Sequence, residues 1–256
     1  MMNQGFDLSG RTALVTGAAR GLGRAIAIGL AEAGADIALG LRDRASDAGL
    51  VAEIEKRGRR ALPLQLDVKK LDQGRKAIDD TIAAFGHLDI LVNNAGGGID
   101  EMPVENVSEA DFDEIIDLNV RSTFFLSQYA GRHMIGRKQG AIVNMGSQAG
   151  AVALPGEAAY CMGKAAVSHM TKCFAVEWGS HNVRVNCVAP TFFATDGTTD
   201  MLARPDFHAD VLNRIAALHR IGEPQEVAGA VVFLASDAAS MITGHTLMID
   251  GGWTAR

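Results

Sequence analysis

The feature that most constrains the fold is a regular alternation of short apolar runs with longer segments of helical spacing. Each run is rich in β-branched residues or leucine and almost continuously apolar, as expected of a strand covered on both faces. The runs are Thr12–Thr16, Asp36–Leu41, Ala61–Leu66, Leu88–Asn93, Ala141–Met145, Val183–Ala189 and Thr246–Ile249. The helical segments between them are Gly21–Ala33, Arg44–Lys56, Lys70–Phe85, Glu109–Ile135, Ala158–Trp178 and Pro224–Leu234. Because parallel strands need long crossovers, this order predicts an α/β fold, with a doubly wound parallel sheet and helices on both faces.

The unbroken pattern also predicts a single domain over residues 1–256. A chain of 256 residues can bury roughly three quarters of its unfolded surface, so it needs no disulfide or metal to hold it together. We find no repeat, low-complexity tract or linker. One polar stretch at residues 191–219, which contains Pro205 and short helical fragments, interrupts the alternation. So long an excursion between a strand and a helix predicts a functional lid.

Charge and composition argue against several classes of function. Lys and Arg number 24 and Asp and Glu number 30, which gives a formal net charge of −6 and no lysine-rich block for binding nucleic acid. No apolar run approaches the ~20 residues of a membrane span, and Met1–Gly10 lacks the basic and apolar regions of a signal peptide. The three cysteines are widely spaced and odd in number, which is typical of reduced thiols in a cytoplasmic protein. None of the seven histidines belongs to a metal-binding motif, so we expect no metal.

A glycine-rich turn follows the first predicted strand and opens the first predicted helix. Its sequence is Thr16-Gly17-Ala18-Ala19-Arg20-Gly21-Leu22-Gly23. Glycines let the backbone approach a ligand, and a helix N-terminus presents free N–H groups to a pyrophosphate. The spacing G-x-x-x-G-x-G differs from the G-x-G-x-x-G of most dinucleotide folds, and three glycines alone also fit an ordinary tight turn. The position of this turn at the first strand–helix junction favours a phosphate-binding site.

Polar residues end the next strands on the same predicted edge. Asp67-Val68 follows the third strand, and Asn93-Asn94-Ala95-Gly96 ends the fourth. Ligands bind such sheets at the carboxyl ends of the strands. Asp67 is suited to accept a hydrogen bond from an adenine amino group. Asn94 fits either a ligand-binding bend or a turn whose backbone it satisfies.

A possible acid–base group lies further along the chain. Tyr160 and Lys164 are four residues apart in one predicted helix, so they share a face. A free tyrosine has a pKa of about 10, and a nearby ammonium group lowers it toward the working range of a base. Ser147, after the fifth strand, could stabilise charge on a substrate oxygen. The Tyr-x-x-x-Lys pattern also occurs on ordinary amphipathic helices, where the ring packs and the lysine is solvated.

Taken together, these motifs closely resemble the short-chain dehydrogenase/reductase family over essentially the whole chain. The matching features are Thr16-Gly17-x-x-x-Gly21-x-Gly23, Asp67, Asn93-Asn94-Ala95-Gly96, Asn119, Ser147, Tyr160-x-x-x-Lys164 and Asp250-Gly251-Gly252. The resemblance implies a Rossmann-type seven-stranded sheet and a nicotinamide dinucleotide cofactor. It also implies that Tyr160 is the general acid/base and that Ser147 polarises the reacting oxygen. Lys164 would lower the tyrosine pKa and bind the nicotinamide ribose, and Asn119 would hold a water relay.

The resemblance extends to the cofactor contacts, with one departure. We expect contacts from Gly17, Ala19, Arg20, Gly21, Leu22, Gly23, Arg42, Asp67, Val68, Asn94, Ala95, Gly96, Tyr160, Lys164, Pro190 and Thr195. The family usually has Pro-Gly after the sixth strand, whereas this chain has Pro190-Thr191. Thr191 adds a side chain where the backbone would run near the nicotinamide, which leaves the local turn geometry open.

The second strand favours NADP over NAD as the cofactor. Folds that prefer NAD place an acidic residue at the end of this strand, where it binds the ribose hydroxyls and repels a 2′-phosphate. Here the strand ends in Leu41, Arg42 follows, and Arg20 lies in the glycine turn. Two guanidinium groups can bind a 2′-phosphate. The alternative is NAD, with Arg42 a solvated charge that Asp43 partly neutralises.

The expected function is hydride transfer between nicotinamide and a secondary alcohol or ketone. The segments Phe6–Thr16, Gly86–Gly96 and Gly244–Arg256 most resemble sugar-acid and polyol dehydrogenases. The similarity to 3-oxoacyl-thioester reductases is nearly as close. A non-catalytic dinucleotide-binding protein is the alternative from another class, because fold alone does not fix function.

The expected assembly is a homotetramer, with a small molecule as the substrate. The resemblance implies one contact made by Glu109–Ile135 and Ala158–Trp178 and another near the carboxyl end. Ala158–Trp178 spreads apolar residues over more than one face, so more than its own sheet must cover it. Trp253 fits either a subunit contact or packing against its own domain.

Overall fold

The computed structural model describes residues 4–47 and 49–255, so Met1–Asn3, part of the Met1–Gly10 segment considered above, lie outside the described residues. Seven strands form one sheet in the order β3-β2-β1-β4-β5-β6-β7, and every neighbouring pair is parallel. The strands are β1 (Thr12–Thr16), β2 (Asp36–Leu41), β3 (Ala61–Gln65), β4 (Ile90–Asn93), β5 (Gly140–Met145), β6 (Val183–Pro190) and β7 (Thr246–Ile249). All seven predicted strands are present, with ends shifted by at most two residues, and the Rossmann-type fold is confirmed.

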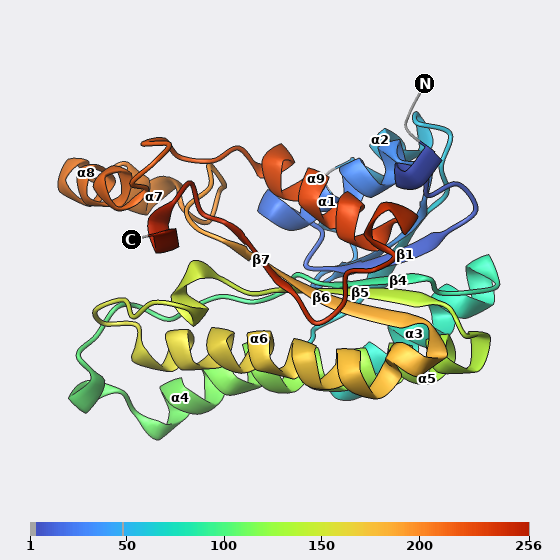
Figure 1. The fold of residues 1–256 in the computed structure, drawn as a ribbon, viewed down its shortest axis with the longest axis horizontal. Helices are drawn as coiled ribbons and strands as arrows, with labels where there is room; N and C mark the ends of the chain where they lie inside the picture. Colours follow the sequence, from blue (N-terminus) through green and yellow to red (C-terminus); the bar gives the residue numbers. More distant parts are fainter. Residues whose placement is uncertain (1–3, 48, 256) are drawn as a thin grey trace.

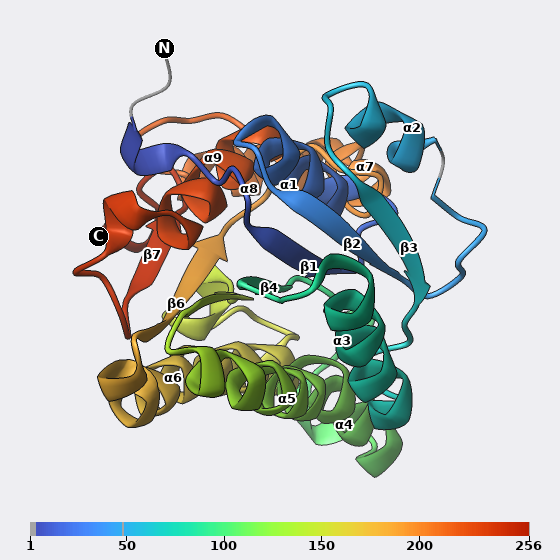
Figure 2. The same ribbon diagram turned by 90° about the vertical axis from the view of Figure 1, so that its right-hand side faces the viewer.

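Helices cover both faces of the sheet, and each face has its own apolar core (Figures 1 and 2). One face packs against α1 (Gly21–Glu32), α2 (Leu50–Glu55) and α9 (Pro224–Ala235). The other packs against α3 (Leu71–Phe85), α5 (Ser122–Arg137) and α6 (Ala158–Trp178). Buried strands such as β1, all of whose side chains are inaccessible, explain why the sequence shows continuous apolar runs instead of alternation.

The strand order reverses between β1 and β4, which places the main crevice of the sheet there. β1 pairs with β2 on one side and with β4 on the other. The crossover helices from these strands leave toward opposite faces, so a gap opens at their carboxyl ends. Thr16 and Asn93 end the two strands at this gap. The glycine turn and the Asn93–Gly96 segment therefore meet at one place.

Two expected helices differ from the structure. The expected helix Arg44–Lys56, whose residue 48 lies outside the described part, begins only at Leu50. Asp43 accepts a hydrogen bond from the backbone of Ala45 (3.0 Å), and Gly49 is left-handed at φ 77°, so the chain bends before the helix starts.

The expected helix Glu109–Ile135 is also divided. It consists of α4 (Glu109–Ile115), a π-helical turn (Ile116–Arg121) and α5. Ser108 caps α4 by accepting a hydrogen bond from the Asp111 N–H (3.1 Å). The π-helical turn follows where Asn119 turns its side chain into the structure, as described below.

The stretch 191–219 carries two short helices, α7 (Thr199–Leu202) and α8 (Pro205–Arg214). They lie beyond the carboxyl edge of the sheet, at the left of Figure 1. Trp253 packs against this region: its ring stacks on Phe192 with centroids 5.9 Å apart, and it is 7% exposed. Trp253 therefore packs against its own chain, and its additional place in a subunit contact stays a prediction.

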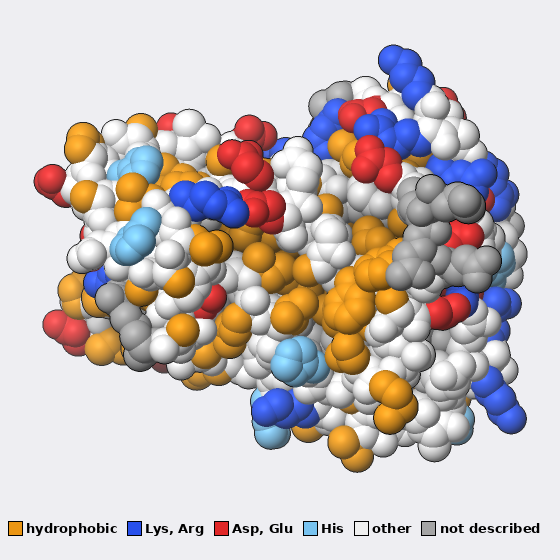
Figure 3. Space-filling model, turned by 45° about the horizontal axis from the view of Figure 1, so that its top comes forward, with side chains coloured by type: hydrophobic (Ala, Val, Ile, Leu, Met, Phe, Trp, Pro, Cys, Tyr) orange, Lys and Arg blue, Asp and Glu red, His pale blue; other side chains and the backbone are white. Residues whose placement is uncertain are grey.

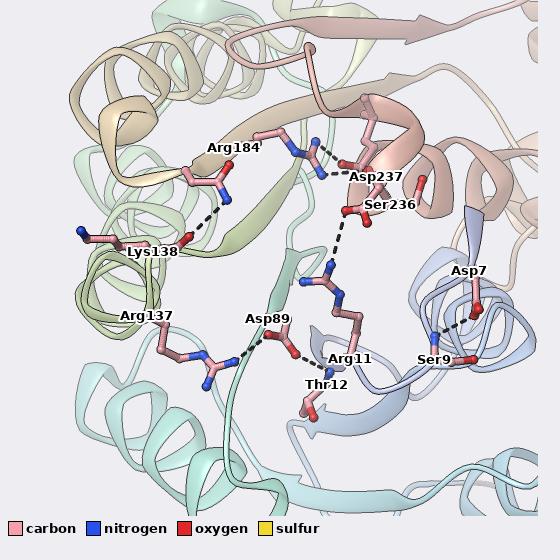
Figure 4. Close-up of polar contacts among 12 residues, drawn as sticks. Asp7, Ser9, Arg11, Thr12, Asp89, Arg137, Lys138, Arg184, Ser236 and Asp237 are labelled. Atoms are coloured by element: carbon pink, nitrogen blue, oxygen red, sulfur yellow. Dashed lines mark hydrogen bonds and ion pairs between the residues drawn. The ribbon is translucent and has the colours of Figure 1, made fainter. Parts of the chain in front are cut away.

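A cluster of polar side chains lies at the amino ends of the strands, the edge of the sheet opposite to the carboxyl edge (Figure 4). The buried Asp89 carboxylate accepts hydrogen bonds from the Thr12 N–H (2.9 Å) and from Arg137 (3.4 Å). Arg184 donates to the carbonyls of Leu234 (2.7 Å) and Ser236 (3.0 Å), which closes the end of α9. These bonds join β1, β4, β6 and α9, so their role is structural. In the described residues, no helix is long and apolar enough to cross a membrane.

Candidate active site

A cavity of about 800 Å³ opens at the carboxyl edge of the sheet, over the reversal of strand order. It is lined by nearly all of the residues that the sequence singled out: Gly17, Ala19, Arg20, Gly21, Leu22, Gly23, Arg42, Asp67, Val68, Asn94, Ala95, Gly96, Ser147, Tyr160, Lys164, Pro190 and Thr195. Asn119 lies just behind the wall. Residues up to 178 positions apart in the sequence thus form one continuous surface.

The glycine turn is shaped to receive a phosphate group. Gly17 and Gly21 adopt left-handed conformations, with φ of 65° and 54°. A Cβ on Gly23 would lie 2.5 Å from Asn94 Nδ2 and closer still to the Gly17 carbonyl, so only glycine fits there. No side chain caps the N-terminus of α1, which leaves its first amide groups for a ligand. These residues fit the pyrophosphate of a dinucleotide.

Thr16 and Asn94 tie the glycine turn to the end of β4. The Thr16 hydroxyl accepts hydrogen bonds from the N–H groups of Asn94 and Ala95, both at 2.9 Å. Asn94 Nδ2 donates to the carbonyls of Thr16 (2.8 Å) and Gly17 (3.2 Å). Asn94 therefore satisfies turn backbone, one of the two roles considered for it, while it also lines the cavity.

Tyr160, Lys164 and Ser147 meet at the inner end of the cavity. Lys164 Nζ lies 5.6 Å from the centre of the Tyr160 ring and donates a hydrogen bond to the Met145 carbonyl (2.9 Å). The Ser147 hydroxyl donates to Gln148 Oε1 (2.7 Å) and accepts from the Ala149 N–H (3.1 Å). The shared helix face of Tyr160 and Lys164 is confirmed: α6 spans the predicted range, and both side chains line the same cavity.

The electrostatics of this group differ from the expectation. Burial raises the pKa of Tyr160 to about 12, against the lowering influence of the Ser147 hydroxyl, and the charge of Glu157 raises it further. Burial also lowers the pKa of Lys164 to about 8. In the protein by itself, desolvation of the buried phenol is the dominant effect on the Tyr160 pKa, and the lowering influence of Lys164 stays a prediction.

Asn119 supports the cavity floor from the π-helical turn. Its Oδ1 accepts from the Gly97 N–H (3.1 Å), and its Nδ2 donates to the carbonyls of Gly97 (2.8 Å) and Ile115 (3.0 Å). A Cβ on Gly96 would lie 2.8 Å from Asn119 Oδ1 and 3.1 Å from Lys164 Nζ, so the amide and the ammonium group flank the same glycine. The sequence of the turn contains neither Gly nor Pro, so nothing in it signals a break in the predicted helix.

Charged side chains of both signs line the outer part of the cavity, the acidic ones being Asp43, Asp67 and Glu114. Arg20 and Arg42 line it, both are exposed, and neither has an ion-pair partner among the described residues. Asp43, considered as a neutralising neighbour, lines the same cavity and accepts a hydrogen bond from the Ala45 N–H of its own loop (3.0 Å). Ser46, Lys69, Phe193 and Thr198 also line the cavity; Phe193 and Thr198 fall in the predicted lid, and no sequence motif marks Ser46 or Lys69. Of these, Lys69 is paired with Glu114 at 2.9 Å.

Thr191 does not disturb the end of β6. Its N–H donates to the Ile249 carbonyl (3.2 Å), so the ladder with β7 continues past Pro190. The side chain lines the cavity, while its hydroxyl oxygen is buried without a partner among the described residues. The usual glycine is therefore not required for the local backbone in this chain.

A phosphate-binding glycine turn and a Ser–Tyr–Lys group in one Rossmann-type crevice define a dinucleotide-dependent oxidoreductase. A family model described as enoyl-(acyl carrier protein) reductase matches residues 17–254. The chain belongs to the short-chain dehydrogenase/reductase family, whose members of this kind act on CH–OH groups with NAD(P).

Three relatives illustrate the range of activities. The chain is 40% identical over 260 residues to a 2-dehydro-3-deoxy-D-gluconate 5-dehydrogenase of Escherichia coli, with full coverage of both chains. It is 40% identical over 263 residues to a D-threitol dehydrogenase of Mycolicibacterium smegmatis, covering 98% of this chain and 95% of the relative. It is 39% identical over 245 residues to a 3-oxoacyl-(acyl-carrier-protein) reductase of Staphylococcus epidermidis, covering 94% and 98%.

Solved structures of relatives contain both cofactor types. A gluconate 5-dehydrogenase of Burkholderia cenocepacia, in complex with NADP and tartrate, has a TM-score of 0.94 and 36% identity, covering 99% of this chain and 98% of the other. A 7α-hydroxysteroid dehydrogenase complexed with NADH has a TM-score of 0.93 and 34% identity, covering 98% of each.

Proposed function

We propose that this protein transfers a hydride between a nicotinamide cofactor and a secondary alcohol or ketone of a polyol or sugar acid. The observation that carries the proposal is the meeting of Ser147, Tyr160 and Lys164 in the cavity that also contains the glycine turn. The printed names of the relatives favour sugar-acid and polyol substrates.

In this proposal the polar side chains transfer a proton, orient the substrate oxygen or bind the cofactor. Bound nicotinamide supplies or accepts the hydride. Ser147 donates a hydrogen bond to the substrate oxygen, once its hydroxyl turns from Gln148. Tyr160 gives that oxygen a proton in reduction and takes one in oxidation. Its raised pKa keeps the phenol protonated at neutral pH, which suits reduction. Lys164 binds the nicotinamide ribose, and Asn119 positions Gly97 and the proton path beside it.

The cofactor is NADP(H) in this proposal, with NAD(H) as the alternative. Leu41 ends β2 where NAD-preferring folds carry an acid. Arg20 and Arg42 have no carboxylate partners among the described residues and are therefore available to a 2′-phosphate. The relative with bound NADP supports this choice, and the relative with NADH keeps the alternative open.

Two other features complete the proposal. The stretch 191–219 acts as a substrate lid within a single domain, because its helices stand over the carboxyl edge of the sheet that holds the cavity. The three cysteines are free thiols, which supports a cytoplasmic location.

The assembly is proposed to be a homotetramer. Phe112, Phe124 and Met162 are 40%, 37% and 45% exposed on the layer of α4, α5 and α6. On another side, apolar side chains form a band across the face that Figure 3 brings forward. The edge strand β7 has one unpaired side, and an uncovered edge is a liability that a subunit contact removes. Light scattering at micromolar concentration tests this: a monomer would contradict it.

A coupled absorbance screen tests the function. Purified protein is mixed with NADP⁺ or NAD⁺ and a panel of polyols and aldonates, and with NADPH or NADH and the matching ketones and 3-oxoacyl thioesters. The proposal expects turnover with a polyol or sugar acid. Turnover of thioesters only would favour the reductase alternative. Tight cofactor binding without turnover of any compound would identify a non-catalytic binding protein.

A further inference from the structure

The lid stretch 191–219 has an apolar core of its own, and the C-terminal tail supplies part of it. Val211 and Ile215 of α8 are each 1% exposed, and they pack with Trp253, which is 7% exposed. In Figure 1 the C-terminus accordingly lies beside α7 and α8. The partly buried side chains around these three are Val152, Leu154, Phe192, Leu202, Phe207 and Ile221. This core is separate from the two larger ones on the faces of the sheet.

Hydrogen bonds fix the tail against the lid. The Asp250 carboxylate accepts from the Thr254 N–H (2.8 Å) and from the Thr254 hydroxyl (2.6 Å), which closes a turn at the end of the chain. The Gly251 carbonyl accepts from the N–H groups of Ala217 (3.1 Å) and Leu218 (3.0 Å), just after α8. The tryptophan between these residues is therefore held by bonds within the tail and by bonds to the lid.

Trp253 reaches the wall of the cavity through one other ring. It stacks on Phe192, with centroids 5.9 Å apart and 27° between the ring planes. Phe192 lies between Thr191 and Phe193, and both of these residues line the cavity. The Phe192 carbonyl accepts a hydrogen bond from the Gly222 N–H (3.1 Å). The wall segment 191–193 is thus held by the backbone of Gly222 and by the ring of Trp253.

This wall segment borders the reacting end of the cavity. Met145, the last residue of β5, pairs with Val188 of β6, and the Gly146 N–H donates to the Val188 carbonyl (2.8 Å). The two chains therefore leave the sheet side by side, about 4.8 Å apart, which brings Ser147 and Thr191 to neighbouring strand ends. A displacement of the wall would move the surface beside the serine that we propose orients the substrate oxygen.

On the basis of the proposed function, we infer that Trp253 is a positioning residue for hydride transfer. From the C-terminal tail, and through Phe192, it holds the wall segment in the place that the nicotinamide and the substrate require. Without the ring a void opens behind Phe192, and a shift of about 1 Å at a reacting centre can cost about 10²-fold in rate. The adenosine end of the cavity is formed by other elements, the glycine turn and Asp67.

The test separates the two ends of the cavity. Trp253→Ala should lower kcat/KM for the best substrate of the screen by about 10–100-fold. The Kd for 2′-phospho-ADP-ribose, which is NADP without its nicotinamide, should stay within about twofold. Trp253→Phe keeps an aromatic ring on Phe192 and should restore kcat/KM to within about threefold of wild type. In Trp253→Ala, hydrogen exchange should become faster in residues 192–218 but not in β1, β4 and β5.

A double-mutant cycle tests the route through Phe192. Phe192→Ala should lower kcat/KM as Trp253→Ala does, and the double variant should lose little more than either single variant. Trp178→Ala is the matched control: this ring stacks on Phe174 (4.5 Å) outside the cavity lining, and its removal should leave kcat/KM within about threefold. If Trp253→Ala does not fold, Trp253→Leu, which fills the lid core without stacking, gives the same comparison.

The outcomes distinguish this inference from the proposed function. An unchanged kcat/KM in Trp253→Ala, additive losses in the cycle, or an equal loss of 2′-phospho-ADP-ribose binding would overturn the inference. A loss of activity that accompanies a change of assembly in light scattering would assign Trp253 to a subunit contact and would also overturn it. Each of these results leaves the oxidoreductase proposal intact. No turnover by wild type with any compound of the screen would overturn the proposed function, and this inference with it.

Discussion

Replacing Arg42 with alanine tests how the cofactor is selected. The Arg42 side chain is exposed at the outer end of the cavity and has no carboxylate partner among the described residues. Its backbone carbonyl accepts a hydrogen bond from Gln65 (2.5 Å), a contact that alanine keeps. The substitution therefore removes the guanidinium group without disturbing the loop. With that group the protein loses a cation that we propose binds the 2′-phosphate, the feature that distinguishes NADP from NAD.

The expected size follows from the exposure of the site. A hydrogen bond to a charged group is worth about 1.5–3 kcal/mol, and solvent screening at an exposed site reduces this to about 1–2 kcal/mol. Arg42→Ala should therefore lower kcat/KM for NADPH by about 5–30-fold and leave that for NADH within about twofold. Arg44→Ala, on the same loop but outside the cavity, is the matched control and should change neither. A wild-type NADPH/NADH ratio below one, or a ratio unchanged by Arg42→Ala, would refute the assignment.

Three further perturbations have defined outcomes. Gly23→Ala places a Cβ 2.5 Å from Asn94 Nδ2 and should weaken cofactor binding at least about tenfold by calorimetry, whereas Gly136→Ala, with open space around it, should not. The pKa of Tyr160 is raised to about 12, and oxidation of the alcohol needs the phenolate. The rate of oxidation should therefore rise by up to about tenfold per pH unit from pH 7 to 10, while the rate of reduction should not. Equal pH profiles in both directions would contradict this. Asp89→Ala leaves the Thr12 N–H and Arg137 without their buried acceptor. The free energy of unfolding, measured in urea, should therefore fall by about 3 kcal/mol. A loss under about 1 kcal/mol would contradict the structural role of the polar cluster at the amino edge of the sheet.

The strands and the long helix α6 could be predicted because their signals are local. The continuous apolar runs follow from burial on both faces, and α6 begins and ends as predicted at Ala158 and Trp178. The glycine turn was recognisable because its positive φ angles at Gly17 and Gly21 need glycine. These elements are sufficient to predict the parallel sheet and a ligand-binding site at the carboxyl ends of its strands.

The π-helical turn and the electrostatics of the site could not be predicted from the sequence, because they depend on contacts between distant parts of the chain. The π-helical turn at Asn119 exists because the amide bonds Gly97, which is 22 residues away in sequence. The direction of the Tyr160 pKa shift depends on how deeply the ring is buried, which spacing to Lys164 does not show.

The central claim is that Tyr160 exchanges a proton with the substrate oxygen in a cavity that binds NAD(P). Its most direct test is kcat for Tyr160→Phe with the best substrate from the screen, alongside the cofactor Kd by fluorescence titration. Removing one hydroxyl leaves the ring and its packing in place. We predict that kcat falls by about 10²–10⁴-fold while the cofactor Kd stays within about twofold. A variant that retains more than about a tenth of the wild-type kcat would contradict the role assigned to this residue.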